Sequence, residues 1–196
     1  MPSTDSSTRY HVIVPDISGS SVLVTSTSEG YALPHWATDD GSFWQETRAV
    51  NSELRNRFGL SVATLRACLL DWSAERRDSY YVVDNLSPDW RPPWGSRWIG
   101  RADIPLLRWR EERDRQLVIE WFDDQPSPRR VGWYRPGWYA RARSWILDSL
   151  EAAGYEPTGD VEQLRSWERS SVMRIPTTSD SATSRPSPGS GDMNQR

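Results

Sequence analysis

The sequence predicts an α/β or α+β fold, because segments with helical periodicity alternate along the chain with short segments rich in strand-forming residues. Val50 and Leu54 recur at the four-residue spacing of a helix face within residues 45–58. Residues 10–14 and 20–24, in contrast, contain the valine-rich runs that are typical of strands. Helices and strands that alternate in this way pack against each other as layers around a shared core.

The expected elements follow in the order strands, helix, strands, helix, linker, helix and short strands. Gly59 marks the end of the first helix, because glycine readily adopts the conformation that closes a helix. The remaining expectations are a loop at 31–40, a buried strand at 60–70, a charged turn at 75–79, a strand at 80–83, a proline-rich aromatic loop at 86–98, a helix at 110–123 and strand-like segments at 164–177.

A further helix is expected at residues 137–153, preceded by Pro136 and ended by Gly154. We expect its apolar stripe to face inward, with Arg143 on the opposite face. The residues of this stripe are Trp138, Ala142, Trp145, Ile146, Ser149 and Ala153.

The composition fits one domain with appendages, since the chain has 196 residues and includes 12 Trp and 7 Tyr that can build a core. The net charge of -3 gives no general attraction to nucleic acid or to anionic membranes. All 24 basic residues are arginine. No chemical step can therefore use a lysine amine.

The expected location is cytoplasmic. Cys68 is the single cysteine, so an internal disulfide cannot form, and its apolar neighbours favour a small buried side chain over a reactive thiol. The first residues lack the basic and apolar regions of a signal peptide. No uncharged apolar run approaches the ~18 residues of a membrane span, so no membrane partner is expected.

Residues 52–60 carry a recognisable motif, Ser-Glu-Leu-Arg-Asn-Arg-Phe-Gly-Leu. This segment resembles the end of a Nudix box, in which Arg-Glu, an apolar residue, any residue, Glu-Glu, any residue, Gly and an apolar residue follow one another. The preceding strands and the Leu-Pro loop at 33–34 also suit that family. The resemblance covers residues 10–124 and implies a Nudix-like mixed sheet flanked by helices.

The resemblance extends to only part of the catalytic box. In the family, carboxylates three and four residues apart lie on one helix face and jointly hold divalent cations at a pyrophosphate. The positions that fit the box are Glu53, Leu54, Gly59 and Leu60. The other positions depart from it: Thr38 replaces the opening Gly, Trp44 the upstream Glu, Ser52 the Arg, and Asn56 and Arg57 the paired Glu residues. Glu53 is thus a vestigial metal ligand, and no catalytic residue and no cofactor are expected.

A divergent Nudix hydrolase is the alternative interpretation. It would act on a nucleoside diphosphate derivative with Mg²⁺, and it would need carboxylates from outside the box. Asp39, Asp40 and Glu46 are the residues that could fold back towards Glu53.

A second resemblance involves residues 132–139, 145–146 and 161–175. They are similar to the junction that joins an N-terminal Nudix-like region to an aminoglycoside phosphotransferase-type kinase domain in large bacterial proteins, and 166–176 would match the first kinase strands. The kinase's lysine is missing, and both histidines, His11 and His35, lie far upstream. The resemblance implies a pseudoenzyme, an accessory module for interaction or small-ligand sensing, with a kinase-like domain or protein as its partner.

Arginines and aromatic residues interleave in residues 129–135 and 141–143, a pattern compatible with a nucleic-acid-binding module as a second alternative. The negative net charge favours helix packing instead. A tryptophan series could likewise line a ligand pocket, although packing in the core and its lid is the favoured interpretation. The members of this series are Trp90, Trp94, Trp98 and Trp109.

The predicted organisation has two structured parts, a Nudix-like domain at 10–124 and a helix with remnant kinase strands at 137–179. A linker at 125–136 joins them, and residues 1–9 and 180–196 are expected to be disordered. A bare hairpin is marginal in water, so the short C-terminal strands should be weakly ordered unless they pack on the preceding helix.

Overall fold

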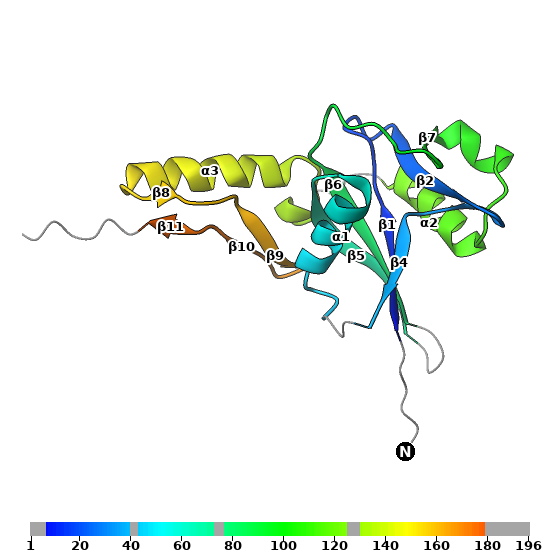
Figure 1. Ribbon diagram of the computed structural model, residues 1–196, viewed down its shortest axis with the longest axis horizontal. Helices are drawn as coiled ribbons and strands as arrows, with labels where there is room; N and C mark the ends of the chain where they lie inside the picture. Colours follow the sequence, from blue (N-terminus) through cyan, green and yellow to red (C-terminus); the bar gives the residue numbers. More distant parts are fainter. Residues whose placement is uncertain (1–6, 40–42, 73–76, 125–129, 179–196) are drawn as a thin grey trace, which may run out of the picture.

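A computed structural model describes residues 7–39, 43–72, 77–124 and 130–178. These ranges leave out most of the two termini that were expected to be disordered. They also leave out part of the linker, part of the charged turn, and Asp40. The described part forms a mixed sheet with helices on both faces, followed by a C-terminal arm that projects to one side (Figure 1). The α+β class predicted from the sequence is confirmed.

The main sheet has four strands in the order β4-β1-β6-β5. These strands are β1 (Thr8–Ile13), β4 (His35–Thr38), β5 (Val62–Trp72) and β6 (Arg77–Asn85). β1 runs parallel to β6 and antiparallel to β4, and β6 runs antiparallel to β5, so the sheet is mixed as predicted. Register shifts in β5 after Thr64 and after Ala67 interrupt its pairing with β6 and leave β5 as an irregular edge strand.

A second sheet has the order β3-β2-β7, formed by β2 (Ser21–Thr27), β3 (Gly30–Ala32) and β7 (Ser96–Gly100). Two predictions are wrong here, since the expected loop at 31–40 contains β4 and the end of β3, and the loop at 86–98 runs into β7. The strands β3 and β4 are short, and their pairing partners β2 and β1 supply the hydrogen bonds that local residue preferences do not reveal.

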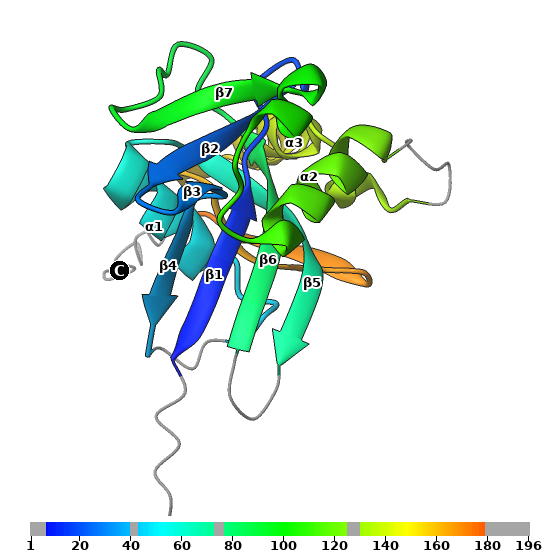
Figure 2. The same ribbon diagram turned by 90° about the vertical axis from the view of Figure 1, so that its right-hand side faces the viewer.

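The helices α1 (Arg48–Phe58) and α2 (Glu112–Asp123) cover opposite faces of the main sheet (Figures 1 and 2). Strand β6 serves both faces, because Tyr81 packs in the core beneath α1 and Tyr80 packs in the core beneath α2. Gly59 ends α1 in the left-handed conformation, with φ of 65°, as expected. A short helix, η1 (Arg101–Leu106), precedes α2. In the described ranges, no helix combines the length and apolarity needed to cross a membrane.

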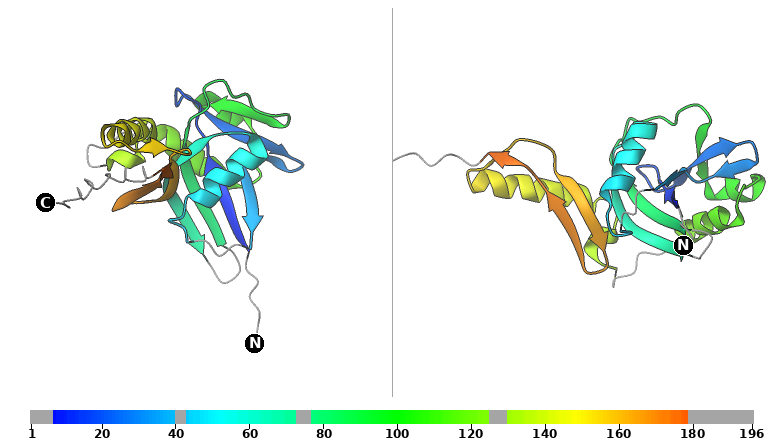
Figure 3. Two further views of the ribbon diagram at one scale, coloured as in Figure 1. Left: turned by 60° about the vertical axis from the view of Figure 1, so that its left-hand side comes forward. Right: turned by 60° about the horizontal axis from the view of Figure 1, so that its bottom comes forward.

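The C-terminal arm consists of residues 130–178 and begins with η2 (Gly132–Tyr134) and α3 (Trp138–Ala152). The strands β9 (Glu162–Trp167) and β10 (Ser170–Arg174) form an antiparallel hairpin, and the short strands β8 (Glu156–Pro157) and β11 (Thr177–Thr178) pair beside α3. Figure 3 shows α3 extending away from the main sheet while β9 remains against it. The hairpin packs on β5 and α1, an arrangement that the sequence did not reveal.

The inward stripe predicted for α3 is wrong in part. Ala142 and Ile146 are half-buried, but Trp145 is 69% exposed, and Ser149 and Ala153 are also exposed. Tyr139, outside that stripe, is the buried residue of the helix. Much of the stripe is uncovered because the helix extends past the edge of the main sheet, as Figure 1 shows, with the short β8 beside it.

Candidate functional site

The outer face of α1 holds the one carboxylate that the Nudix resemblance retains. Glu53 lies on this face, and its Oε2 accepts a hydrogen bond from Nε of Arg57 at 2.6 Å. The guanidinium of Arg57 also lies over the ring of Trp36, 5.9 Å from its centroid. Arg57 is thereby held between an aromatic ring and the Glu53 carboxylate. A cation that approached Glu53 would meet the positive charge of this arginine.

Among the carboxylates that could have rebuilt the box, Glu46 is engaged away from Glu53. Glu46 accepts a hydrogen bond from Nη2 of Arg165 at 3.4 Å, which directs it towards β9. Asp39 is exposed after the end of β4, and Asp40 lies outside the described residues. Within the part of the chain that the structure describes, no group of three or more His, Cys, Asp and Glu side chains is placed to hold a metal ion.

The space beside Glu53 is small. A cavity of about 250 Å³ lies there, lined by residues that include Tyr10, Trp36, Ser52 and Arg57. Pockets for drug-sized ligands typically hold about 300–1,000 Å³. The described residues around Glu53 therefore form a small site in which an arginine pairs with the carboxylate.

A buried polar network joins α1, β5 and the C-terminal arm. Gln163 is 4% exposed, and its amide pairs with both main-chain groups of Thr64: Nε2 donates to Thr64 O at 2.8 Å, and Thr64 N donates to Oε1 at 2.8 Å. Asn51 completes the network, since its Nδ2 donates to Gln163 Oε1 at 3.2 Å and its Oδ1 accepts from Thr64 Oγ1 at 2.8 Å. The Gln163 side chain thus takes the place of a strand partner at the bulged edge of β5.

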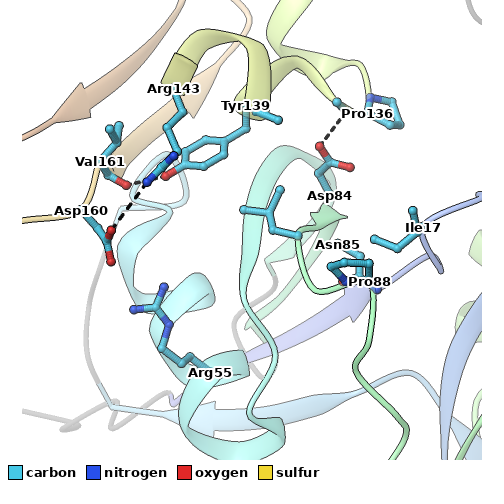
Figure 4. Close-up of a pocket in the computed structure, with 13 residues that line it drawn as sticks. Ile17, Arg55, Asp84, Asn85, Pro88, Pro136, Tyr139, Arg143, Asp160 and Val161 are labelled. Carbon is cyan, nitrogen blue, oxygen red and sulfur yellow. Dashed lines mark hydrogen bonds and ion pairs between the residues drawn. The ribbon is translucent and has the colours of Figure 1, made fainter. Parts of the chain in front are cut away.

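A much larger cavity, of about 680 Å³, lies where the arm meets the end of β6 (Figure 4). One wall comes from α1, the end of β6 and the loop that follows it, and the opposite wall comes from the first turns of α3 and the approach to β9. Its lining residues are Ile17, Arg55, Asp84, Asn85, Leu86, Pro88, Pro136, Gly137, Tyr139, Ala140, Arg143, Asp160 and Val161. No sequence pattern predicts this cavity, because its two walls are distant in sequence and share no motif.

Two hydrogen bonds fix the walls of this cavity. Asp84 Oδ2 accepts from the main-chain N of Gly137 at 2.7 Å, which ties the start of α3 to the end of β6. Burial raises the pKa of the Asp84 carboxyl, and the Gly137 bond and the charge of Arg141 oppose that rise. The hydroxyl of Tyr139 donates to the carbonyl of Val161, and burial raises the pKa of this phenol too. The cavity is therefore a preformed feature of the fold.

The tryptophan series does not line this cavity. Trp90 packs edge-on against Trp98 and donates through Nε1 to the carbonyl of Phe58 at 2.7 Å, which is the expected structural packing. Trp109 donates to the carbonyl of Ile104 at 3.0 Å. Trp94, in contrast, is exposed to solvent. Trp90, Trp98 and Trp109 therefore serve packing, whereas Trp94 does not.

A buried histidine between two carboxylates also escaped sequence analysis. His11 Nδ1 lies 3.4 Å from Oδ1 of Asp114, and Nε2 lies 3.8 Å from Oδ1 of Asp78. Its ring stacks on Tyr80 with 4.4 Å between the ring centroids. Asp114 Oδ2 accepts from the main-chain N of Leu33 at 2.9 Å, so this cluster links β1, β6 and α2 across the core. Its burial favours a structural role over a reactive one.

Comparisons with known proteins give partial likenesses in fold. No protein-family model matches the sequence, and no curated protein matches it. A Nudix hydrolase from Nitrosomonas europaea is similar to the structure, with 14% identity, coverage of 62% of this chain and 75% of that one, and a TM-score of 0.48. MutT from Aliivibrio salmonicida or Vibrio cholerae is similar too, with 14% identity, coverage of 60% of this chain and 97% of that one, and a TM-score of 0.46.

A proposed oxidoreductase from Sinorhizobium meliloti 1021 is similar as well, with 15% identity, coverage of 60% of this chain and a TM-score of 0.48. This chain covers 39% of that protein's length. All of these likenesses are partial, and none of them assigns an activity to this chain.

Proposed function

We propose that this chain is a non-catalytic Nudix-like accessory module of a phosphotransferase-type protein. The observation that supports the loss of catalysis is the 2.6 Å hydrogen bond from Arg57 to Glu53, which sets a positive charge at the place where a divalent cation would be required. Asn56 at the other ligand position offers a neutral amide in place of a carboxylate. Among the described residues, no group of three or more His, Cys, Asp and Glu side chains is placed to hold the Mg²⁺ that catalysis would need.

The proposed role is interaction with a kinase-like domain or protein, and the outer side of the C-terminal arm is the proposed contact. Trp145 is 69% exposed and Tyr155 is 46% exposed on this arm. Exposed aromatic residues of this size are typical anchors of protein interfaces. The arm also contains the residues that resemble a kinase junction, which supports a kinase-like lobe as the partner.

Calorimetric titration with Mg²⁺ and Mn²⁺, followed by an assay of nucleoside diphosphate hydrolysis, tests the loss of catalysis. We expect no binding and no hydrolysis from the natural chain. The variant Asn56→Glu/Arg57→Glu restores both carboxylates and removes the blocking charge, so it should gain metal binding. It is the positive control for the titration, because it shows that the fold can present a metal site.

The divergent hydrolase would be supported by the opposite pattern. Metal binding by the natural chain that disappears in Glu53→Gln, together with Glu53-dependent hydrolysis, would overturn the proposal. Contact with a purified kinase domain of the aminoglycoside phosphotransferase type is tested separately by Trp145→Ala. That variant should weaken binding, whereas Trp94→Ala, at an exposed tryptophan outside the arm, should leave binding unchanged.

A further inference from the structure

We infer that the cavity of about 680 Å³ between the C-terminal arm and the end of β6 binds a small organic anion with an apolar body. Its volume falls within the range of about 300–1,000 Å³ that is typical of ligand sites. The inference concerns a different part of the molecule from the Nudix box and does not depend on whether Glu53 is active.

The body of the ligand would be held by apolar walls. Leu86 and Pro88 contribute one side, and Ala140 and Val161 contribute the other, with Ile17 at the rim. Each of these side chains presents hydrocarbon to the cavity and offers no hydrogen bond. A flat aromatic or aliphatic body would remove this surface from water, which is the main source of affinity in pockets of this kind.

Arg55 supplies the recognition of charge. It projects from α1 into the cavity, and in the described ranges no acidic side chain forms an ion pair with it (Figure 4). The other arginines of this helix are committed, since Arg48 pairs with Glu162 at 2.8 Å and Arg57 pairs with Glu53. A planar guanidinium can donate two parallel hydrogen bonds to a carboxylate, sulfonate or phosphate.

Two carboxylates, those of Asp84 and Asp160, also line the cavity beside Arg55 and Arg143. Asp84 already accepts the hydrogen bond from Gly137, and it is 8% exposed. Asp160 lies 3.9 Å from Arg143, and both side chains are well exposed, so this ion pair is weak and solvent-screened. Arg143 is therefore available as a second cation when an anion enters next to Arg55.

Fluorescence titration with two related probes tests this inference. One probe is 8-anilinonaphthalene-1-sulfonate, and the other is N-phenyl-1-naphthylamine, which has the same rings without the sulfonate. We expect the natural chain to bind the sulfonate more tightly. Arg55→Gln should weaken sulfonate binding by about tenfold, the effect of losing one charge-assisted hydrogen bond, and should leave the neutral probe unaffected.

Two further variants locate the binding. Ala140→Trp places a large side chain in the cavity from the exposed face of α3, so it should abolish binding of both probes. Arg113→Gln removes an exposed arginine on α2, on the opposite face of the main sheet, and should change neither affinity. Circular dichroism of each variant confirms that its fold is unchanged.

Competition with 2-naphthoate and with 1-naphthyl phosphate then separates the possible anionic groups. Displacement of the sulfonate probe by either compound supports the inference and identifies a carboxylate or a phosphate ester as the preferred group. An equal loss of affinity for both probes in Arg55→Gln would overturn the inference. Probe binding that Ala140→Trp leaves intact would overturn it as well. Failure of both competitors to displace the probe would also overturn it.

Discussion

Replacement of Gln163 by leucine tests the most specific contact between the C-terminal arm and the sheet. Leucine has a similar volume but cannot hydrogen-bond, so Gln163→Leu leaves the main-chain N–H and C=O of Thr64 without their partners at 2.8 Å, and Asn51 loses an acceptor. A buried polar group left unsatisfied costs about 1–3 kcal/mol. The two main-chain groups together give an expected loss of roughly 2–6 kcal/mol in the free energy of unfolding.

Urea unfolding followed by circular dichroism measures this loss. Gln116→Leu is the matched control, because Gln116 is exposed on α2 and its side chain donates to the exposed Glu120 at 3.2 Å. The control should change stability by no more than about 0.5 kcal/mol. A Gln163→Leu protein that is as stable as the control would refute the reasoning, since it would mean that the Gln163 amide does not satisfy these groups.

The remaining predictions concern two titrating groups. Burial raises the pKa of Asp84 above its ordinary value of 3.8, so the folded protein binds a proton that the unfolded chain releases as pH rises past that value. The natural chain should therefore lose stability with rising pH relative to Asp84→Asn. In urea unfolding between roughly pH 4 and 7, the free energy of unfolding of the natural chain minus that of the variant should decline; a constant difference would contradict the prediction. Burial also raises the pKa of the Cys68 thiol from 9.0 to about 11. At pH 8 the folded protein should thus react with iodoacetamide roughly a hundredfold more slowly than the urea-unfolded chain, as followed by mass spectrometry, and equal rates would count against burial of the thiol.

The regular elements were predictable because their cause is local. The helices expected at 45–58, 110–123 and 137–153 are present as α1, α2 and α3, and Gly59 ends α1 as its backbone freedom suggests. Apolar spacing reports directly on the face that a helix buries. The class of fold follows from the order of such elements, so the α+β class could also be predicted from the sequence.

The remaining features depend on contacts between distant parts of the chain. Strand β4 has four residues and forms because β1 lies beside it, which no property of residues 35–38 reveals. The apolar stripe on α3 predicts a buried face, yet Trp145 is exposed. Periodicity shows that a face is apolar without showing what covers it. Gln163 and Arg55 lie within segments that resemble known families, but neither resemblance assigns them a role, because their environment is set by elements far away in sequence.

The bulge in β5 has a consequence for the solubility of the protein. β5 is an edge strand, and open edges can template pairing with strands of other molecules. Gln163 occupies both hydrogen-bonding groups of Thr64, and the Ser166 hydroxyl occupies the carbonyl of Leu65 at 3.0 Å. Side chains, rather than another strand, therefore seal this edge. A chain without the arm would expose that edge as a nucleus for intermolecular β-pairing and aggregation.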